Sequence, residues 1–339
     1  MRGLNLAILG ATGAVGTEML KILAERSFTV KDLKLFAAPD EAGKKIVYMG
    51  KEYTVEVATP EGFEGIDLTL VAVGNDISLR YSPEAVKRGS VVVDNSSAYR
   101  MDPKVPLVIP EVNGEDIWTH QGIVANPNCA TIIAMVPIKP LHDYGRATRI
   151  IASTYQSASG AGVPGMLELK EQTMQVLNGQ PVQHKAFGHQ LAFNVIPHID
   201  RFMENDYTYE EMKLFNEGRK ILHCPDLMVT CTSVRVPVFR SHSESITIEF
   251  EREVTPEKAK ELLAAAPGVK IVDDPGNNVY PMPIDSSDQD LIYVGRIRKD
   301  ISAPNSLTFW CCGDQIRKGA ATNAVQIALL LAEKIGEKA

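Results

Sequence analysis

The chain has 339 residues, a net charge of −7, and contents of 45% hydrophobic and 23% charged residues. This length suits two domains of ordinary size, and the composition is typical of a soluble globular protein. Lysine and arginine form no basic stripe, and the longest uncharged run is interrupted by prolines and asparagines. Neither nucleic acid nor a membrane is therefore expected as a partner.

Cysteine and histidine usage predicts a reducing compartment and no metal site. The cysteine number is odd, no Cys-x-x-Cys pair occurs, and the histidines lack the His-x-x-x-His spacing of metal sites. The N-terminus enters a strand-like run at Leu4 without the apolar core of a secretion signal. We therefore expect a cytoplasmic protein.

The first part of the chain alternates short apolar runs with helical patterns. Continuous Val, Ile and Leu runs of this kind are typical of a parallel sheet covered by helices on both faces. Residues 1–128 are therefore predicted to form a doubly wound, Rossmann-type dinucleotide-binding domain of the α/β class. The expected strands are Leu4–Gly10, Leu33–Ala37, Asp67–Val73 and Val91–Asp94, and the expected helices are Thr17–Arg26 and Ser82–Arg88.

The pattern changes after about Arg149. Longer runs appear, and in one of them Ile246 and Ile248 alternate with polar residues, as in an antiparallel sheet with one wet face. Thr255 followed by a proline and a glutamate predicts a helix start. Residues 129–315 are therefore predicted to form an α+β domain with a mainly antiparallel sheet. The expected strands are Leu227–Phe239, Ser243–Glu253, Leu291–Lys299 and Ser306–Gly313, and a last amphipathic helix is expected over Ala320–Ile335.

A glycine loop follows the first expected strand and opens the first helix. Gly10, Gly13 and Gly16 stand at positions 1, 4 and 7 of this loop, a longer first spacing than in the common Gly-x-Gly-x-x-Gly pattern. Glycines at such a turn let the backbone approach a pyrophosphate, whose charge then lies at a helix N-terminus. The candidate cofactor-binding residues here are Gly10, Thr12, Gly13, Ala14 and Val15.

Cys129 is the strongest candidate for a catalytic group. It follows Asn126-Pro127-Asn128 and opens a long apolar run, as expected for a cysteine in the first turn of a buried helix with Asn128 as N-cap. The positive end of a helix dipole favours the thiolate, which is the nucleophilic form of a thiol. The alternative is a small buried hydrophobic residue, the usual fate of a free cysteine.

Several segments together resemble the bacterial aspartate-β-semialdehyde dehydrogenases. The match extends over nearly the whole chain in the expected order. Members of this family reduce L-aspartyl-4-phosphate to L-aspartate 4-semialdehyde with NADPH and release phosphate, in the biosynthesis of lysine, threonine and methionine. The matching segments are Gly10–Gly16, Val93–Arg100, Val108–Asn113, Asn126–Cys129, Ser153–Gly162, Asn194–Asp200, Asp206–Lys213, Arg235–Ser245, Gly295–Asp300 and Lys318–Ala321.

The resemblance implies a catalytic set of three residues. Cys129 corresponds to the nucleophile that displaces phosphate and forms a thioester. His242 corresponds to the acid/base residue, and an ordinary histidine pKa near ~6.5 would suit that role. Gln156 corresponds to the residue that orients the substrate beside the cysteine.

The same resemblance assigns the substrate-binding residues. Arg235 corresponds to the arginine that binds the substrate α-carboxylate through a planar, bidentate guanidinium. Glu210 and Lys213 match a Glu-x-x-Lys pair whose acid faces the substrate ammonium and whose lysine faces phosphate. Arg100 and Asn128 correspond to further phosphate-binding residues.

The cofactor assignments include one departure from the family. Ser159, Gly160 and Gln315 correspond to contacts near the nicotinamide. After the second strand, bacterial relatives typically carry an Arg-Ser pair that holds the 2′-phosphate of NADP, and this chain has Asp40-Glu41 instead. NADP remains the expected coenzyme. We expect the protein to accept NAD as well, because acids at this place bind the ribose hydroxyls of NAD. The family also implies a homodimer formed by residues 129–315, and a first domain completed by the C-terminal segment 316–339.

Three other functions fit the sequence less well. An N-acetyl-γ-glutamyl-phosphate reductase would use the same Cys and His but would not need an acid for a free ammonium, which disfavours it because Glu210 is present. A non-catalytic paralogue would not need Cys129, Gln156, Arg235 and His242 together. A cysteine hydrolase of thioesters would leave the glycine loop unexplained.

Overall fold

The computed structural model describes residues 3–337, and the chain forms two compact units. The first unit consists of Met1–Asn128 and Ala320–Ala339, and the second of Cys129–Gly319. The second unit thus extends past the expected end at residue 315. Within the described residues, no helix is both long enough and apolar enough to cross a membrane.

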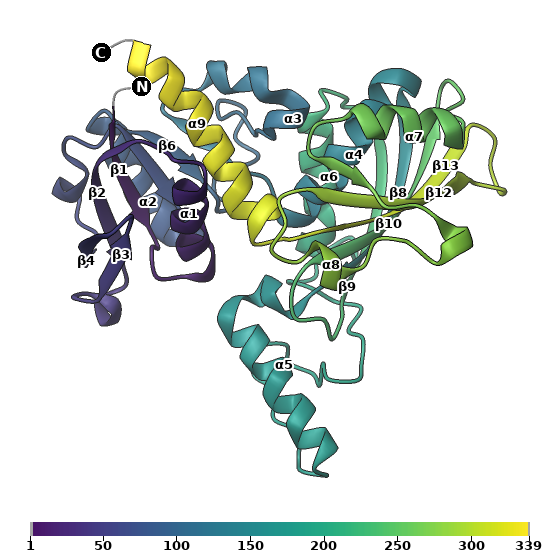
Figure 1. Cartoon of the computed structure of the whole chain (residues 1–339), viewed down its shortest axis with the longest axis horizontal. Coiled ribbons are helices and arrows are strands. Elements are labelled where there is room, and N and C mark those ends of the chain that lie inside the picture. The colour runs from purple at the N-terminus through teal and green to yellow at the C-terminus, as the bar shows by residue number, and fades with distance from the viewer. Residues whose placement is uncertain (1–2, 338–339) are drawn as a thin grey trace. The chain divides into compact units, whose positions relative to one another are not determined.

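The first unit contains a seven-stranded sheet with the order β3-β4-β2-β1-β5-β6-β7 (Figure 1). Its pairings are parallel except for the antiparallel hairpin of β3 and β4. In the strand order, β2 lies on one side of β1 and β5 on the other. The connections therefore diverge at β1, and a topological switch point lies at its carboxyl end. The strands are β1 (Leu4–Leu9), β2 (Val30–Ala37), β3 (Lys45–Tyr48), β4 (Lys51–Val57), β5 (Leu68–Val71), β6 (Val91–Asp94) and β7 (Ile123–Ala125).

The first two helices of this unit begin earlier than the sequence pattern predicted, whereas the last helix begins two residues later than the expected Ala320. Helix α1 (Ala14–Glu25) starts directly after Gly13 rather than at Thr17. Helix α2 (Asn75–Lys87) starts well before the expected Ser82 and carries Pro83 in its interior. A proline fits best in the first turn of a helix, so the predicted start lay just before Pro83, which is in fact inside α2. The short α3 (Pro110–Asn113) and the last helix α9 (Thr322–Glu337) complete the unit, and α9 adds Ala324, Ala328 and Leu331 to its core.

The second unit contains a six-stranded sheet with the order β11-β12-β13-β10-β8-β9. The inner pairings are antiparallel as predicted, whereas the outer pairs β8–β9 and β11–β12 are parallel. Parallel pairing of β8 with β9 requires a long crossover, which contains two helices. The strands are β8 (Ala147–Gln156), β9 (Met228–Arg235), β10 (His242–Phe250), β11 (Val269–Ile271), β12 (Ile292–Lys299) and β13 (Ser306–Gly313).

The predicted bounds of β9 and β10 needed correction. Strand β9 ends at Arg235 rather than Phe239, since Pro237 lacks the N–H that a ladder needs. Strand β10 begins one residue earlier than expected, at His242, and ends at Phe250. The earlier end of β9 and the earlier start of β10 place the polar residues Arg235 and His242 at strand ends.

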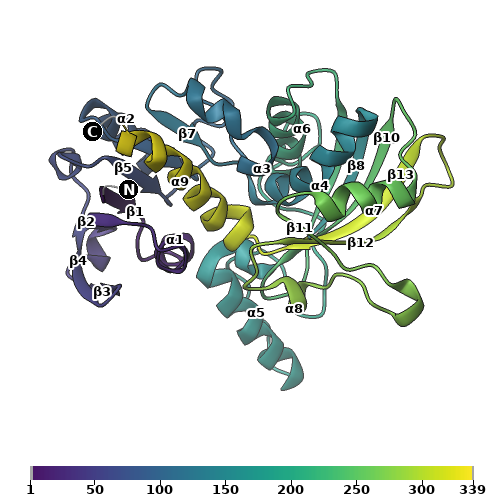
Figure 2. The ribbon, with the colours of Figure 1, turned by 45° about the horizontal axis from the view of Figure 1, so that its top comes forward.

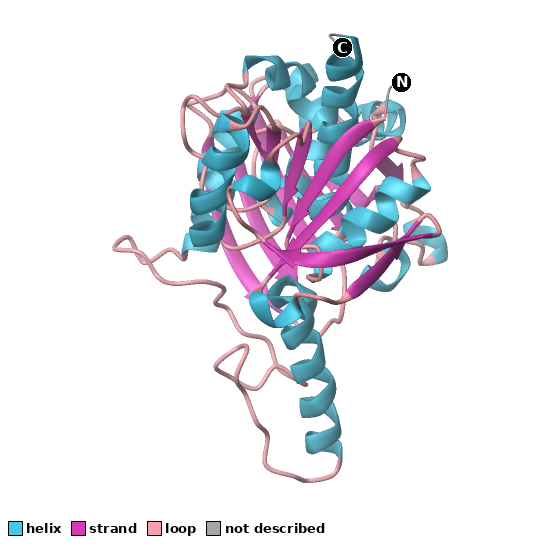
Figure 3. Ribbon diagram, turned by 90° about the vertical axis from the view of Figure 1, so that its left-hand side faces the viewer, coloured by secondary structure: helices cyan, strands magenta, loops and turns pink. Residues whose placement is uncertain are grey.

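Helices cover one face of the second sheet (Figure 2). Helix α4 (Cys129–Gly145) contacts β8, β10, β12 and β13, with α6 (Tyr209–Ile221) and α7 (Pro256–Ala265) beside it. Helix α7 begins as predicted, because the Thr255 side chain accepts a hydrogen bond from the Lys258 backbone. Helix α5 (Gly162–Leu177) extends away from this sheet with long loops beside it (Figure 3), and α8 (Pro283–Ser286) is a single turn.

The register of the second sheet aligns polar side chains at one end. Gln156 at the end of β8 pairs with Arg235 at the end of β9, and His242 at the start of β10 pairs with Gly313. Ser243 pairs with Tyr155, so these ends are neighbours in the sheet. The candidate residues Gln156, Arg235 and His242 therefore lie at the same end of this sheet.

Candidate active site

Cys129 is the first residue of helix α4, and its Sγ lies 3.5 Å from Nε2 of His242. The cysteine is half-buried, in contrast with the four other cysteines, which are buried. Gly319 lies directly behind it, because a Cβ on Gly319 would come within 3.1 Å of the Cys129 Cβ. A thiol at a helix start, next to an imidazole and partly open, is the arrangement that activates a nucleophile.

His242 is fully buried and held on its other nitrogen by Ser157. Its Nδ1 accepts a hydrogen bond from the Ser157 backbone N–H at 3.1 Å and lies 3.0 Å from the Ser157 hydroxyl. Burial, together with the positive charge of Arg235, lowers the pKa of His242 to about 3. The expectation of an ordinary histidine pKa is therefore wrong for this structure, because the site excludes the water that would solvate an imidazolium.

Gln156 connects this pair to an acidic residue. Its amide nitrogen donates to Oε1 of Glu210 at 3.1 Å, and its oxygen accepts from the Thr154 hydroxyl at 3.0 Å. The amide nitrogen also lies 3.4 Å from Nε2 of His242. These contacts fix the orientation of the amide between the histidine and the carboxylate.

Glu210 is buried and held in place through the start of helix α6. Thr208 and Glu211 form a reciprocal capping box there, and Glu211 also accepts from the Ser233 backbone on β9 at 2.9 Å. Lys213, one turn along, pairs with Glu210 at 2.7 Å and with Asp200 at 3.1 Å. The predicted Glu-x-x-Lys pair therefore shares one helix face, as its spacing requires.

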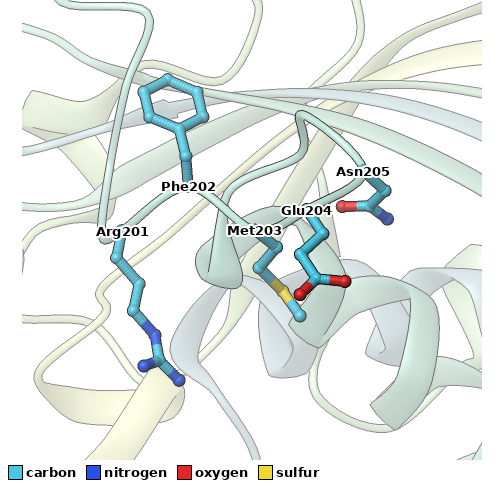
Figure 4. Close-up of a pocket in the computed structure, with 5 residues that line it drawn as sticks. All are labelled: Arg201, Phe202, Met203, Glu204 and Asn205. Atoms are coloured by element: carbon cyan, nitrogen blue, oxygen red, sulfur yellow. The ribbon is translucent and has the colours of Figure 1, made fainter.

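The loop before α6 forms a hollow of about 490 Å³ lined by residues 201–205 (Figure 4). The Phe202 ring and the Arg201 side chain extend to opposite sides of the loop. Arg201 lies over the Tyr209 ring, and the Tyr209 backbone N–H donates to the Arg201 carbonyl at 2.8 Å. The loop thus anchors the first turn of α6, which carries Glu210.

Arg235 lies at the end of β9 and is almost fully buried. Its Nη1 donates to the Ser157 carbonyl at 2.7 Å, and burial lowers its pKa, partly offset by the charge of Glu210. Gly160 lies against it, because a Cβ on Gly160 would come within 2.6 Å of Arg235 Nη1 and 3.2 Å of His242 Cε1. Gly160 therefore makes room for these two side chains, in addition to any contact with a coenzyme.

Ser159 and Gln315, both expected near the nicotinamide, are buried and hydrogen-bonded to each other. The Gln315 oxygen accepts from the Ser241 backbone N–H at 2.9 Å, and Ser159 lies 3.0 Å from the Ser157 hydroxyl. The structure thereby connects the two residues to His242 through Ser157. The sequence had not singled out Ser157, which is an ordinary serine without its fold.

Arg100 and Asn128 belong to the first unit, and Asn128 directly precedes Cys129. Arg100 donates to the carbonyls of Asn126 and Asn95, both at 2.9 Å. Asn126 is itself buried and held by the Asn95 and Asn323 side chains at 2.6 and 2.7 Å. Arg100 therefore fixes the backbone that leads into Cys129.

The first unit contains a pocket of about 570 Å³ at the carboxyl ends of its strands, lined in part by Gly10, Thr12 and Gly13. Gly10 has φ +92°, and a Cβ there would collide with the Ala72 carbonyl. A Cβ on Gly16 would collide with the Gly10 carbonyl, whereas a Cβ on Gly13, at the start of α1, would lie at an ordinary contact distance of 3.5 Å from that carbonyl. These are the three roles of a dinucleotide loop: a tight turn, close helix packing and an approach for pyrophosphate.

Asp40 and Glu41 follow β2 in a 3₁₀ turn, Pro39–Glu41, whose first residue lines the same pocket. Glu41 pairs with Lys44 at 2.5 Å. Arg80, which lies over the Tyr81 ring, also lines the pocket. The acids Asp40 and Glu41 therefore directly follow the pocket-lining Pro39, and the Arg80 guanidinium belongs to another part of the pocket lining.

Glu244 is a buried acid that sequence reasoning missed. It is fully buried on β10, two residues after His242, and pairs in register with Thr154 and Cys311. Neither carboxyl oxygen has a hydrogen-bond partner in the described part of the chain, and burial raises its pKa well above the usual value.

In residues 3–337, His, Cys, Asp and Glu form no group of three or more that could hold a metal ion.

Comparison with known proteins identifies the family. Two family descriptions match, "Semialdehyde dehydrogenase, NAD binding domain" over residues 5–120 and "Semialdehyde dehydrogenase, dimerisation domain" over residues 138–318. An aspartate-semialdehyde dehydrogenase of Synechocystis is 51% identical over 98% of both chains. The chain belongs to the aspartate-semialdehyde dehydrogenase family. The expected resemblance is thereby confirmed.

Further members of the aspartate-semialdehyde dehydrogenase family agree in sequence and fold. The enzyme of Aquifex aeolicus is 50% identical over 98% of this chain and 99% of its own. A crystal structure of aspartate semialdehyde dehydrogenase II from Vibrio cholerae, complexed with ASA, has a TM-score of 0.96 at 41% identity and covers 98% of this chain and 99% of that one. The chain is therefore an oxidoreductase with a nicotinamide-dinucleotide-binding domain, and the N-acetyl-γ-glutamyl-phosphate reductase alternative is not favoured.

Proposed function

We propose that this chain reduces L-aspartyl-4-phosphate to L-aspartate 4-semialdehyde with NADPH, releasing phosphate, on the route to lysine, threonine and methionine. The observation that carries the proposal is Cys129 at 3.5 Å from His242, with Arg235 and Glu210 at the same end of the sheet. The complex of the Vibrio cholerae relative with ASA supports the choice of substrate.

Charge supports the aspartyl group as the substrate. The Arg235 guanidinium suits the α-carboxylate, and the buried Glu210 carboxylate suits the free ammonium. An N-acetylated substrate carries no ammonium and would leave Glu210 without a cationic partner on the ligand. Lys213, Arg100 and Asn128 are the proposed phosphate-binding residues.

The chemistry assigned to the chain begins at sulfur. The Cys129 thiolate attacks the acyl carbon, the carbon–oxygen bond to phosphate breaks, and a thioester forms on Cys129. Gln156 holds the acyl group beside the sulfur, and His242 donates toward the oxygen on which charge develops. The dinucleotide supplies a hydride when bound, and the thiolate is the group that leaves as the aldehyde forms.

The dinucleotide would be held by the loop Gly10–Gly16, with its pyrophosphate at Thr12, Gly13, Ala14 and Val15. NADP is the leading coenzyme, and we propose that NAD is also accepted. Asp40 and Glu41, which directly follow the pocket-lining Pro39, would repel a 2′-phosphate, whereas Arg80, which lines the pocket, would attract it. Because Glu41 already pairs with Lys44, the two acids differ in how much charge they direct toward the pocket.

We also propose a homodimer that acts in the cytoplasm. The dimerisation description matched by residues 138–318 supports the first part. Ile151, Tyr155 and Met228 are exposed on the sheet face opposite α4, since their neighbours in sequence alternate toward the buried face. Large apolar side chains on one face are typical of a contact between copies.

The proposed location in the cytoplasm is supported by cysteine chemistry. Five free cysteines suit a reducing compartment.

The direct test follows nicotinamide absorbance with aspartate semialdehyde, NADP and phosphate. We expect continuous reduction of the coenzyme only when all three are present, no more than one NADPH per enzyme without phosphate, and none with Cys129→Ala. N-acetylglutamate semialdehyde serves as the competing substrate. An equal rate without phosphate, or a higher kcat/KM for the acetylated substrate, would refute the proposed function.

A further inference from the structure

A strap of chain, residues 183–192, is tied to helix α5 by two buried side chains. Oε2 of Glu168 accepts hydrogen bonds from the backbone N–H groups of residues 185–186 at 2.7 and 2.6 Å. One turn further along α5, Oε1 of Gln172 accepts from the N–H groups of residues 191–192 at 2.7 and 3.1 Å. These two pairs of hydrogen bonds, the clamps, hold the strap at two points with a short stretch of chain between them.

The spacing of Glu168 and Gln172 explains how one helix holds both ends of this stretch. Residues four positions apart share a face of a helix, so both side chains extend from the same side of α5. Nε2 of Gln172 donates to Oε1 of Glu168 and to the Gln183 carbonyl, both at 3.1 Å, which leaves the amide oxygen for the strap. Both side chains are buried, so little water competes for these hydrogen bonds.

Phe187 lies between the two clamps and contacts Arg235. Cζ of Arg235 lies over the Phe187 ring, 5.6 Å from its centroid, which is within reach of a cation–π contact. The ring also lies against Gly165 of α5, because a Cβ on Gly165 would come within 2.9 Å of Cζ of Phe187. It packs in addition on a small core cluster that includes Leu169 of α5 and Leu191 of the strap. The strap and the helix together therefore place this ring.

The protein supplies few other contacts that fix the plane of the Arg235 guanidinium. In residues 3–337 its only hydrogen-bond acceptor is the Ser157 carbonyl, to which Nη1 donates at 2.7 Å. One hydrogen bond fixes one atom and leaves the plane free to turn, whereas bidentate binding of a carboxylate needs the whole plane in place. A ring over the face of the guanidinium limits this turning and leaves the other N–H donors for a ligand.

We propose that Phe187 is a positioning residue that holds the Arg235 guanidinium in the plane that binds the substrate α-carboxylate. The clamps on Glu168 and Gln172 hold Phe187 in this place. The proposal deepens the proposed function and rests on it. Because Arg235 is buried, the negative face of the ring also replaces part of the solvation that the cation loses, and this attraction is stronger than at an exposed site.

The first measurement is the ¹H–¹⁵N NMR spectrum of the full-length enzyme labelled at arginine, with the Arg235 Nε–H signal assigned by its loss in Arg235→Lys. A ring current shields protons that lie over an aromatic face, so we expect this signal to move downfield in Phe187→Leu. Phe193→Leu is the matched control, because Phe193 follows the strap and is exposed. An Arg235 signal that is the same in Phe187→Leu and the wild type would overturn the inference. This readout needs no substrate, so failure to use aspartate semialdehyde would refute only the proposed function.

The second measurement is the steady-state kinetics of the same variants, together with an enzyme that carries difluorophenylalanine at position 187. The fluorinated ring keeps the shape of phenylalanine but has a less negative face. We expect KM for aspartate semialdehyde to rise about fivefold in Phe187→Leu and by an intermediate factor with the fluorinated ring, while kcat stays within about twofold of the wild type. Phe193→Leu should keep the wild-type KM. An unchanged KM in Phe187→Leu, or with the fluorinated ring, would show that the ring only fills space.

The third measurement tests the clamps and stays informative if substitutions of Phe187 prevent folding. Glu168→Ala removes the acceptor for residues 185–186, so amide hydrogen exchange in the strap should become faster and KM for semialdehyde should rise about fivefold, as in Phe187→Leu. Glu171→Ala is the matched control, since Glu171 is an exposed acid on the same helix. Faster exchange in Glu168→Ala with a wild-type KM would contradict the inference that the clamps hold Phe187 over Arg235.

Discussion

Cys129 Sγ lies 3.5 Å from Nε2 of His242, although 113 positions separate the two residues in sequence. Each is the first residue of its element, helix α4 and strand β10. Helix α4 packs on the sheet face that carries His242, so the contact follows from the packing of one helix on one strand. Both members of the reactive pair are therefore positioned by elements of the second unit.

Substitutions of His242 and Arg235 are expected to separate catalysis from binding. His242→Asn should lower kcat by about a hundredfold or more and change KM little, because it removes a donor used as charge develops. Arg235→Lys should mainly raise KM for semialdehyde, by about tenfold, because a point charge replaces a planar fork. Steady-state kinetics with both variants checks this, and the reverse pattern would show that the two roles are misassigned.

Gly160→Ala is expected to impair substrate binding through Arg235. A Cβ at this position would come within 2.6 Å of Arg235 Nη1, so the guanidinium must move. KM for semialdehyde should rise by about tenfold, or roughly 1.4 kcal/mol, with an unchanged melting temperature. Gly114→Ala is the matched control, since a Cβ there meets open space. Wild-type kinetics for Gly160→Ala would mean that the neighbouring side chains yield without consequence.

Glu244→Gln is expected to stabilise the protein at neutral and alkaline pH. Burial raises the Glu244 pKa in the folded state, so the folded chain keeps a proton that the unfolded chain releases above about pH 4.3. Stability of the wild type therefore falls as pH rises above that value, by at most about 1.4 kcal/mol per pH unit from this group. The amide has the same shape and does not ionise, so the variant should lack this part of the slope.

Urea unfolding of the wild type and Glu244→Gln across pH measures the difference. Glu171→Gln serves as the control, because it removes an exposed carboxylate from α5. A difference between wild type and Glu244→Gln that does not grow with pH would show that Glu244 is ionised in the folded protein.

Coenzyme discrimination is expected to be weak. Asp40 and Glu41 directly follow Pro39, which lines the pocket of the first unit, and each carboxylate should cost a bound 2′-phosphate about 1 kcal/mol. The ratio of kcat/KM for NADP and NAD at one salt concentration should lie below about a hundredfold, or roughly 2.7 kcal/mol. Replacing both acids, Asp40→Arg with Glu41→Ser, should raise the ratio. Glu64→Gln, an exposed acid elsewhere in the first unit, should leave it unchanged. A higher wild-type ratio would mean that the acids point away from the site.

Local signals in the sequence were enough for much of the fold. The Thr255-Pro256-Glu257 start of α7 and the run of β13 were predicted at their observed ends, because capping and apolar runs are local properties. The hairpin of β3 and β4 was missed, since its strands are short and largely exposed. Strand β7 was missed because it is only three residues long.

The site was less predictable than the fold. Cys129, His242 and Arg235 stand in motifs with a recognisable order along the chain. Ser157 and Glu244, by contrast, acquire their properties only from sheet register and burial, which no local pattern reports. The lowered His242 pKa has the same origin, because the desolvation of a ring depends on everything packed around it.

The central claim is that Cys129 carries the acyl group. The decisive measurement mixes enzyme with aspartate semialdehyde and NADP in the absence of phosphate, and follows both the coenzyme absorbance and the mass of the protein. We predict a burst of NADPH equal to the enzyme concentration and an aspartyl adduct that peptide mapping places on Cys129, both absent in Cys129→Ala. Turnover by Cys129→Ala above a few per cent of the wild-type rate, or an adduct on another residue, would contradict this account.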